Sequence, residues 1–132
     1  RVDAMARRLG LEEALDRFPY QVSGGQKQRA AAARALITEP DLVLADEPTG
    51  NLDSRAARDL LEALADLNGE LQATILLVTH DPVAASYCRR ILFIKDGRLF
   101  TELVRGDAPR KRFFDRILGV LAELGGGGTD VL

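Results

Sequence analysis

Hydrophobic positions recur every three or four residues along much of the chain. This spacing, or a run of strong helix formers, predicts helices, because residues three or four apart share one helix face. We expect Gly10 to end the first helix and Ser54 to cap the fourth. The segments expected to be helical are 2–9, 11–18, 26–37, 54–67, 82–87 and 112–124.

Two of these helices carry continuous apolar stripes. The stripe of 54–67 consists of Ala57, Leu60, Leu61, Leu64 and Leu67. The stripe of 112–124 consists of Phe113, Phe114, Ile117, Leu118, Leu121 and Leu124. Such stripes bury against a core, and we expect the last helix to cover its own sheet rather than to dock a partner.

Two short segments, 42–45 and 73–79, are almost entirely apolar. The first is bounded by Pro40 and Pro48, and short apolar runs of this kind indicate strands buried on both faces. Because a predicted helix separates the two segments, we expect them to pair in parallel.

A β-hairpin is expected near the end of the chain. Segments 91–95 and 98–103 are rich in strand-forming residues, and Asp96 and Gly97 between them favour a two-residue turn. We expect this hairpin to lie at one side of the parallel sheet. The predicted fold class is therefore α/β.

The composition fits one globular domain at most. The 132 residues are 46% hydrophobic, and a net charge of −2 argues against a nucleic-acid partner. Cys88, the one cysteine, cannot form an internal disulfide, which fits a cytosolic address. No apolar run reaches the roughly 18 residues of a membrane helix. Because the chain begins with Arg1 rather than Met, we expect it to start partway through something larger.

Polar side chains follow both predicted strands. Asp46 and Glu47 come after the first, and His80 comes after the second. Ligands of parallel α/β sheets bind at the carboxyl ends of the strands. One carboxylate there can hold Mg²⁺, and the other can orient a water and accept its proton. Taken alone, a solvated acidic turn before Pro48 explains the pair equally well, and a lone histidine more often serves as a local hydrogen-bonding residue.

A short polar segment, 23–26, opens the alanine-rich helix. The backbone N–H groups at such a helix start can hold an anion, and glycines let it approach closely. Read in isolation, the segment is more often a capped turn. Its residues are Ser23, Gly24, Gly25 and Gln26.

Together, these segments resemble motifs of the ATP-binding subunit of ABC transporters. Residues 22–26 are similar to the signature motif, which the family usually begins with Leu rather than Val. Residues 42–47 are similar to Walker B with the catalytic glutamate, 51–53 to the D-loop, and 79–81 to the switch-histidine region. Four motifs in the family's order identify the parent domain.

Residues 45–53 resemble one branch of this family, and a second stretch, 79–88 followed by 91–97, narrows the resemblance further. That branch serves macrolide export, lipoprotein release and peptide-antibiotic resistance. Within it, the second stretch is most similar to bacitracin-type antimicrobial-peptide transporters.

The resemblance implies that the chain is the C-terminal part of an ABC ATPase domain, spanning 1–124. Residues 1–22 would end the helical subdomain, and 23–103 would form part of the catalytic core. Residues 112–124 would form the C-terminal helix, and 125–132 a flexible tail.

The resemblance also implies ATP hydrolysis at the interface of a head-to-tail dimer. Asp46 would hold Mg²⁺, Glu47 would polarise the attacking water, and His80 would contact the γ-phosphate. Asp53 would lie across the same interface. The signature would donate hydrogen bonds to ATP on the opposite subunit through Ser23, Gly24, Gly25 and Gln26.

The implied partners are a second ATP-binding subunit and an integral membrane permease. The implied location is the cytoplasmic face of a bacterial cell membrane. The transported substrate is not encoded in these residues, because membrane subunits select it.

One part of the family pattern is absent from these 132 residues. The phosphate-binding P-loop needs a lysine after a glycine and before Ser or Thr, and Lys27, Lys95 and Lys111 all lack that context. The adenine-stacking aromatic residue and the Gln loop, which also precede the signature in the family, are absent too. The implied fold is a partial P-loop NTPase fold without the Walker A strand, loop and helix.

Two other interpretations remain open at the level of sequence. The first is the C-terminal lobe of a DNA-repair or chromosome-organising ATPase, but no sustained heptads precede Val22. His80, together with residues 50–53, favours the transporter branch. The second is a non-catalytic remnant that keeps only the dimer surface.

Because the P-loop supplies most backbone donors to the nucleotide phosphates, we expect the 132-residue chain to bind Mg-ATP weakly and not to hydrolyse it. Titration calorimetry with Mg-ATP measures this directly. Tight binding of one nucleotide per chain would contradict the expectation.

Overall fold

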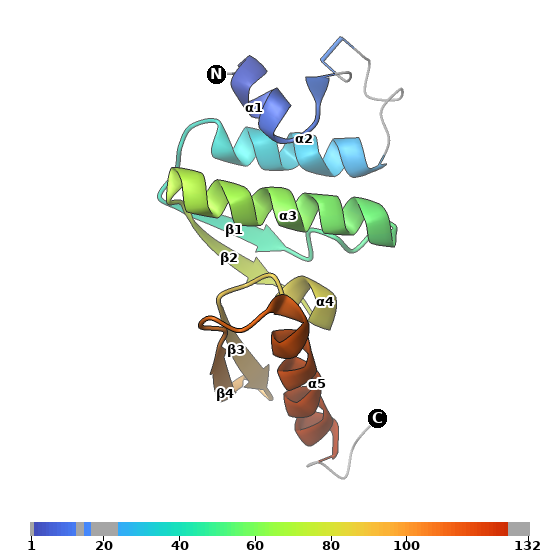
Figure 1. The fold of residues 1–132 in the computed structure, drawn as a ribbon, viewed down its shortest axis with the longest axis vertical. Helices are drawn as coiled ribbons and strands as arrows, with labels where there is room; N and C mark the ends of the chain where they lie inside the picture. Colours follow the sequence, from blue (N-terminus) through green and yellow to red (C-terminus); the bar gives the residue numbers. More distant parts are fainter. Residues whose placement is uncertain (1, 13–14, 17–23, 127–132) are drawn as a thin grey trace. The chain divides into compact units, whose positions relative to one another are not determined.

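The computed structural model describes residues 2–12, 15–16 and 24–126 (Figure 1). The chain divides into two compact units, Arg1–Thr79 and His80–Leu132. Each unit has a hydrophobic core of its own. Among the described residues, no helix has the length and apolar character needed to cross a membrane.

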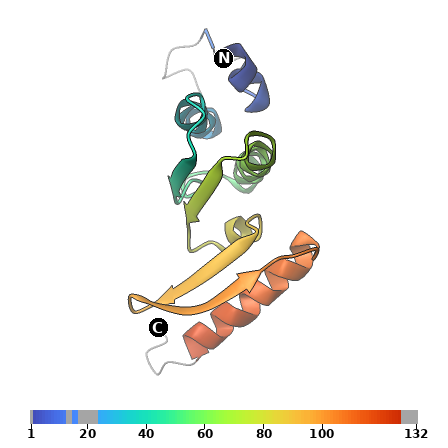
Figure 2. The ribbon, with the colours of Figure 1, turned by 90° about the vertical axis from the view of Figure 1, so that its left-hand side faces the viewer.

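In the first unit, helices pack on a parallel pair of strands. Strands β1 (Leu42–Asp46) and β2 (Thr74–Val78) pair with Leu42 opposite Thr74 and Asp46 opposite Val78. Helices α2 (Gly24–Leu36) and α3 (Ser54–Leu71) lie side by side against this pair (Figures 1 and 2). The parallel pairing expected from the two apolar runs is confirmed.

Helix α1 (Val2–Arg8) ends in a glycine-based cap, as the sequence predicts. Gly10 adopts a left-handed φ of 67°. The Leu11 N–H donates to the Ala6 carbonyl at 2.7 Å, and the Gly10 N–H donates to the Arg7 carbonyl at 3.3 Å. These two bonds define a Schellman motif, which turns the chain back so that Leu11 is buried in the core.

The second predicted helix, 11–18, lies partly outside the described residues. Leu11, Glu12, Leu15 and Asp16 are described, and none of the four belongs to an α-helix. The expectation is therefore wrong for this part of the segment.

The core of the first unit lies between the sheet and its helices. Partly buried side chains from α2, α3 and β2 pack around it. Its buried members are Met5, Ala6, Leu9, Leu11, Leu36, Val43, Leu60, Leu64, Leu67 and Ala73.

The expectation that both strands are buried on both faces is wrong for this chain. Leu44 is 71% exposed and Leu76 is 54% exposed, whereas Val43 of the opposite face is buried. The reason is that α2 and α3 cover one face only, and no other described element of this unit packs on the second face.

Helix α3 begins at Ser54, but its cap is Asp53 rather than the expected Ser54. The Ala56 N–H donates to Asp53 Oδ1 at 2.8 Å. Asp53 itself has an extended backbone, as an N-cap residue requires. The helix continues to Leu71, beyond the expected end at 67, and its apolar stripe is buried as predicted through Leu60, Leu61, Leu64 and Leu67.

The second unit contains the predicted hairpin. Strands β3 (Arg90–Lys95) and β4 (Arg98–Val104) pair antiparallel. Asp96 and Gly97 have φ values of 52° and 75°, as a type I′ turn requires. The hairpin shares no hydrogen-bonded strand with β1 or β2, so it forms a separate sheet instead of an edge of the parallel one.

Helix α5 (Arg110–Gly126) covers one face of this hairpin (Figure 2), as expected. Phe113 and Ile117 of α5 and Phe93 of β3 form its buried core. Leu118 and Leu121 of the predicted stripe are exposed, because they lie to one side of the line of side chains that meets the hairpin.

The short helix α4 (Pro82–Ala85) is tied to α5 within the same unit. The Arg110 guanidinium lies 4.5 Å from the centre of the Tyr87 ring. Its Nη1 also donates to Ser86 Oγ at 3.2 Å, and Ser86 is fully buried. Arg110 therefore joins the start of α5 to the residues that follow α4.

Two neighbouring aliphatic residues of α5 provide a matched stability test. Ile117 is 1% exposed and Leu118 is 41% exposed. We expect Ile117→Ala to lower the free energy of unfolding of this unit by about 2–5 kcal/mol, because it opens a cavity in the core. Leu118→Ala should lower it by less than about 1 kcal/mol. Urea unfolding followed by circular dichroism compares the two, and equal losses would contradict the packing.

Candidate functional site

The predicted acidic pair lies at the carboxyl end of β1. Asp46 is the last residue of the strand, and Glu47 follows it. The Glu47 N–H donates to the Val78 carbonyl at 2.7 Å, which continues the ladder between the strands one bond beyond β1. The position of Glu47 is therefore set by main-chain hydrogen bonds to β2.

The two carboxylates leave the strand in different directions. Asp46 lies two residues after Leu44, so its side chain is on the same, open face of the sheet, and both residues are exposed. Glu47 is half-buried and has a left-handed φ of 47°, which begins a turn that the Gly50 N–H closes by donating to the Glu47 carbonyl at 3.1 Å. The two side chains thus differ in direction and in burial, as the alternation of strand residues predicts.

The Glu47 carboxylate is held by the residue that directly follows β2. Thr79 Oγ1 donates to Glu47 Oε2 at 3.0 Å. Sequence reasoning placed Thr79 in the switch-histidine motif but gave its side chain no role. The only available signal was that a hydroxyl residue follows the second apolar run, and the register that brings it to Glu47 is not readable from the sequence.

Asp46 has the chemistry of a magnesium ligand. Mg²⁺ prefers oxygen donors and takes one or two protein carboxylates, while waters and phosphates complete its shell. The exposed carboxylate at the strand end fits that single-ligand role. Among the described residues there is no group of three or more His, Cys, Asp or Glu that could hold a metal by itself.

A cavity of about 320 Å³ brings the signature and D-loop residues together. The first turns of α2 and α3 both open onto it. Gly24 and Gly25 line it from α2, and Asp53 lines it from the cap of α3. Ser23, the remaining predicted member, lies outside the described residues. Gln26 is half-buried in the first turn of α2 and is not among the lining residues.

The charges around this cavity are mixed. Arg29 and Arg55 line it together with Asp53 and Asp59. The two helix N-termini add partial positive charge, which favours an anionic ligand. The cavity therefore combines backbone donors, cations and carboxylates within the first unit.

A further contact links α2 to the acidic turn. Gln28 Nε2 donates to the Pro48 carbonyl at 2.6 Å. Gln28 lies one turn into α2, so this bond fixes the start of the helix relative to the residues that follow Glu47. Sequence reasoning did not single out Gln28, because a glutamine in a polar helix segment gives no signal of a distant partner.

His80 is exposed and is the first residue of the second unit. The residues that follow it are fixed by the start of α4. The Val83 N–H donates to Asp81 Oδ1 at 2.9 Å, and Pro82 occupies the first turn. His80 thus directly precedes a capped helix start.

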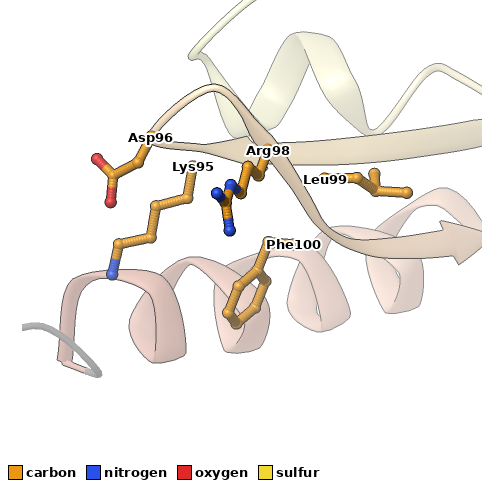
Figure 3. Close-up of a pocket in the computed structure, with 5 residues that line it drawn as sticks. All are labelled: Lys95, Asp96, Arg98, Leu99 and Phe100. Atoms are coloured by element: carbon orange, nitrogen blue, oxygen red, sulfur yellow. The ribbon is translucent and has the colours of Figure 1, made fainter.

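Another cavity, of about 460 Å³, lies at the turn of the hairpin (Figure 3). It is lined by Lys95, Asp96, Arg98, Leu99 and Phe100. Lys95 extends to the last turn of α5, where its Nζ donates to the Leu124 carbonyl at 3.1 Å. None of the predicted site residues lines this cavity.

Cys88 is the only thiol of the chain, and it is not an activated nucleophile. Burial raises the pKa of the Cys88 thiol above its ordinary value. Because the thiolate is the reactive form, the raised pKa keeps this side chain protonated and inert near neutral pH.

Comparisons with known proteins agree with these motifs. A family model described as "ABC transporter" matches residues 1–50. The ABC transporter ATP-binding protein YxdL of Bacillus subtilis (strain 168) is 54% identical over 131 residues, which cover 99% of this chain and 51% of that protein. The bacitracin export ATP-binding protein BceA of Halalkalibacterium halodurans is 57% identical over 122 residues, which cover 92% of this chain and 48% of BceA.

A solved structure shares the fold as well. "Dimeric Structure of MJ0796, a Bacterial ABC Transporter Cassette" matches with a TM-score of 0.65 and 41% identity, over 76% of this chain and 44% of that one. The described residues therefore have the fold of part of an ABC ATPase cassette, a P-loop NTPase fold. The chain is a homologue of ABC transporter ATP-binding proteins and spans about half the length of the curated relatives it matches.

The capping role of Asp53 can be separated from its charge. Asn caps helices about as well as Asp, whereas Ala does not. We expect Asp53→Ala to lower the free energy of unfolding by about 1 kcal/mol and Asp53→Asn to change it by only a few tenths. Urea unfolding measures both, and an equal loss in the two variants would show that the carboxylate charge, not the cap, stabilises α3.

Proposed function

We propose that this chain is part of the ATP-hydrolysing subunit of an ABC transporter. The observation that carries the proposal is the end of the parallel sheet, where Asp46 and Glu47 diverge after β1. In such a pair, one carboxylate can bind a metal ion and the other can orient a water molecule. The sequence identity to about half the length of ABC transporter ATP-binding proteins supports the same conclusion.

In this proposal, Asp46 is a ligand of Mg²⁺, which offsets the negative charge of the ATP phosphates. Glu47 orients the attacking water and accepts its proton. General-base catalysis of this kind contributes about 10²–10⁴-fold in rate. Because phosphoryl transfer depends mainly on positioning and charge stabilisation, the fixed backbone of Glu47 favours the role.

The signature residues act on a nucleotide held by a second subunit. Gly24, Gly25 and Gln26 supply hydrogen-bond donors from the start of α2, and Ser23, which precedes them in the sequence, supplies another. Asp53 lies at the same interface. The shared cavity of Gly24, Gly25 and Asp53 supports this grouping. A head-to-tail homodimer is the assembly it requires, and the solved relative is itself described as dimeric.

His80 contacts the γ-phosphate in this proposal and links it to the water. The support is its place in the sequence, two residues after the end of β2 and directly before Asp81, which caps α4. Hydrogen-bond donors aimed at the developing charge supply much of the rate enhancement in such reactions.

The transported substrate proposed here is an antimicrobial peptide, which the subunit helps to export or remove. The support is the 57% identity to a protein named for bacitracin export. The partners in this proposal are a second ATP-binding subunit and an integral membrane permease. The subunit itself lies on the cytoplasmic face of the membrane.

The role of Glu47 is tested in a full-length subunit that contains these residues. Glu47→Gln keeps the side-chain shape but removes the base, so we expect ATP turnover to fall by at least 10²-fold. Because ATP still binds, the variant should accumulate as an ATP-bound dimer in gel filtration. Glu62→Gln, on the exposed face of α3, is the matched control. Normal turnover in Glu47→Gln would exclude Glu47 as the base.

A further inference from the structure

We propose that Thr79 is the positioning residue of Glu47. This inference rests on the proposed role of Glu47 as general base and deepens it. Thr79 Oγ1 donates to Glu47 Oε2 at 3.0 Å, a distance at the upper end of the normal range for an O–H···O bond. With an ionised acceptor, such a bond is stronger than one between neutral groups.

The pairing of the two residues follows from the backbone. The strands pair with a constant offset, from Leu42 opposite Thr74 to Asp46 opposite Val78. Continued by one position, that register places Glu47 opposite Thr79. The Glu47 N–H bonded to the Val78 carbonyl shows that the ladder does extend this far. The contact therefore joins the two residues that directly follow the paired strands at the carboxyl end of the sheet.

Glu47 needs such a partner because of its own flexibility. A glutamate side chain has three rotatable bonds, and a carboxylate free to sample several rotamers would orient a water poorly. A displacement of about 1 Å at a reacting group can lower a rate by about 10²-fold. The bond from Thr79 holds Oε2 and so restricts the orientation of the whole carboxylate.

Thr79 is suited to this task by its shape. Threonine is branched at Cβ and has few allowed χ1 rotamers. Like Ile75 and Leu77, it is half-buried and lies on the helix-covered face of the sheet. Its hydroxyl is therefore a donor with few conformations, directly next to the end of a paired strand, where its position is more precise than in a long loop.

The first test uses the 132-residue chain and needs no activity. Thr79→Val removes the hydroxyl and keeps the shape, whereas Thr79→Ser keeps the hydroxyl. We expect the NMR order parameter of the Glu47 side-chain carbons to fall in Thr79→Val and to stay near the parent value in Thr79→Ser. Thr74→Val, at the exposed start of the same strand, is the matched control and should change nothing. An unchanged order parameter in Thr79→Val would overturn the proposal.

The second test measures ATP turnover in a full-length subunit that contains these residues. We expect Thr79→Val to lower kcat by roughly 10–100-fold with KM for ATP within about twofold, because only the orientation of the base is lost. Thr79→Ser should restore kcat to within about threefold. A purely structural role would instead lower the unfolding midpoint or raise KM, and either result without a fall in kcat would contradict the proposal.

The two tests separate this inference from the proposed function. If Glu47→Gln retains turnover, the general-base role fails, whereas the order parameter still reports whether Thr79 holds Glu47. If Glu47→Gln is inactive and Thr79→Val is fully active, only the positioning role fails. Should Thr79→Val lose its fold in circular dichroism, Thr79→Ala supplies the same loss of the hydroxyl, and the same outcomes apply.

Discussion

The parallel pairing of β1 with β2 is the constraint on which the candidate site depends. Backbone hydrogen bonds fix which residue of β1 lies opposite which residue of β2. This hydrogen-bond ladder continues by one bond past Asp46. Once this register is set, Glu47 lies opposite Thr79, and the side chain of Asp46 lies on the open face of the sheet. The different directions of these two adjacent acids are thus a property of main-chain geometry, and the proposed division of roles between them depends on it.

The helices extend this order to the signature residues. Asp53 caps α3, and Gln28 of α2 donates to the carbonyl of Pro48 in the turn after Glu47. Both contacts satisfy backbone groups that would otherwise lack a partner inside the protein. They also fix the two helix starts around the cavity that Gly24, Gly25 and Asp53 share. The same contacts therefore satisfy local backbone hydrogen bonds and bring the residues of the candidate site together.

Much of this architecture could be predicted from the sequence, where local signals decide the outcome. The turn at Asp96 and Gly97 needs residues that tolerate positive φ, and Gly10 ends α1 for the same reason. The parallel strands could be predicted because both runs are short and almost entirely apolar, and a helix pattern separates them. Each of these features is encoded within a few neighbouring residues.

Features that depend on distant partners could not be read in the same way. The apolar residues of β1 and β2 suggest two covered faces, but the described helices supply cover for only one, so Leu44 remains exposed. Serine and aspartate are equally good caps, and only the path of the chain selects Asp53 over Ser54. The partner of Glu47 depends on register, which a sequence does not display. Ser23 and residues 127–132 of the expected tail lie outside the described residues and stay predictions, whereas Gly125 and Gly126 of that tail belong to α5.

The left-handed backbone at Glu47 has a consequence for how this turn can vary. A residue with a Cβ in this conformation costs about 1–2 kcal/mol relative to glycine, and a β-branched residue costs more. Glycine would therefore make a more stable turn here, yet it has no side chain to offer Thr79. A glutamate at this position therefore lowers the stability of the turn but holds a carboxylate in place, which is the exchange of stability for activity expected if Glu47 has the proposed catalytic role.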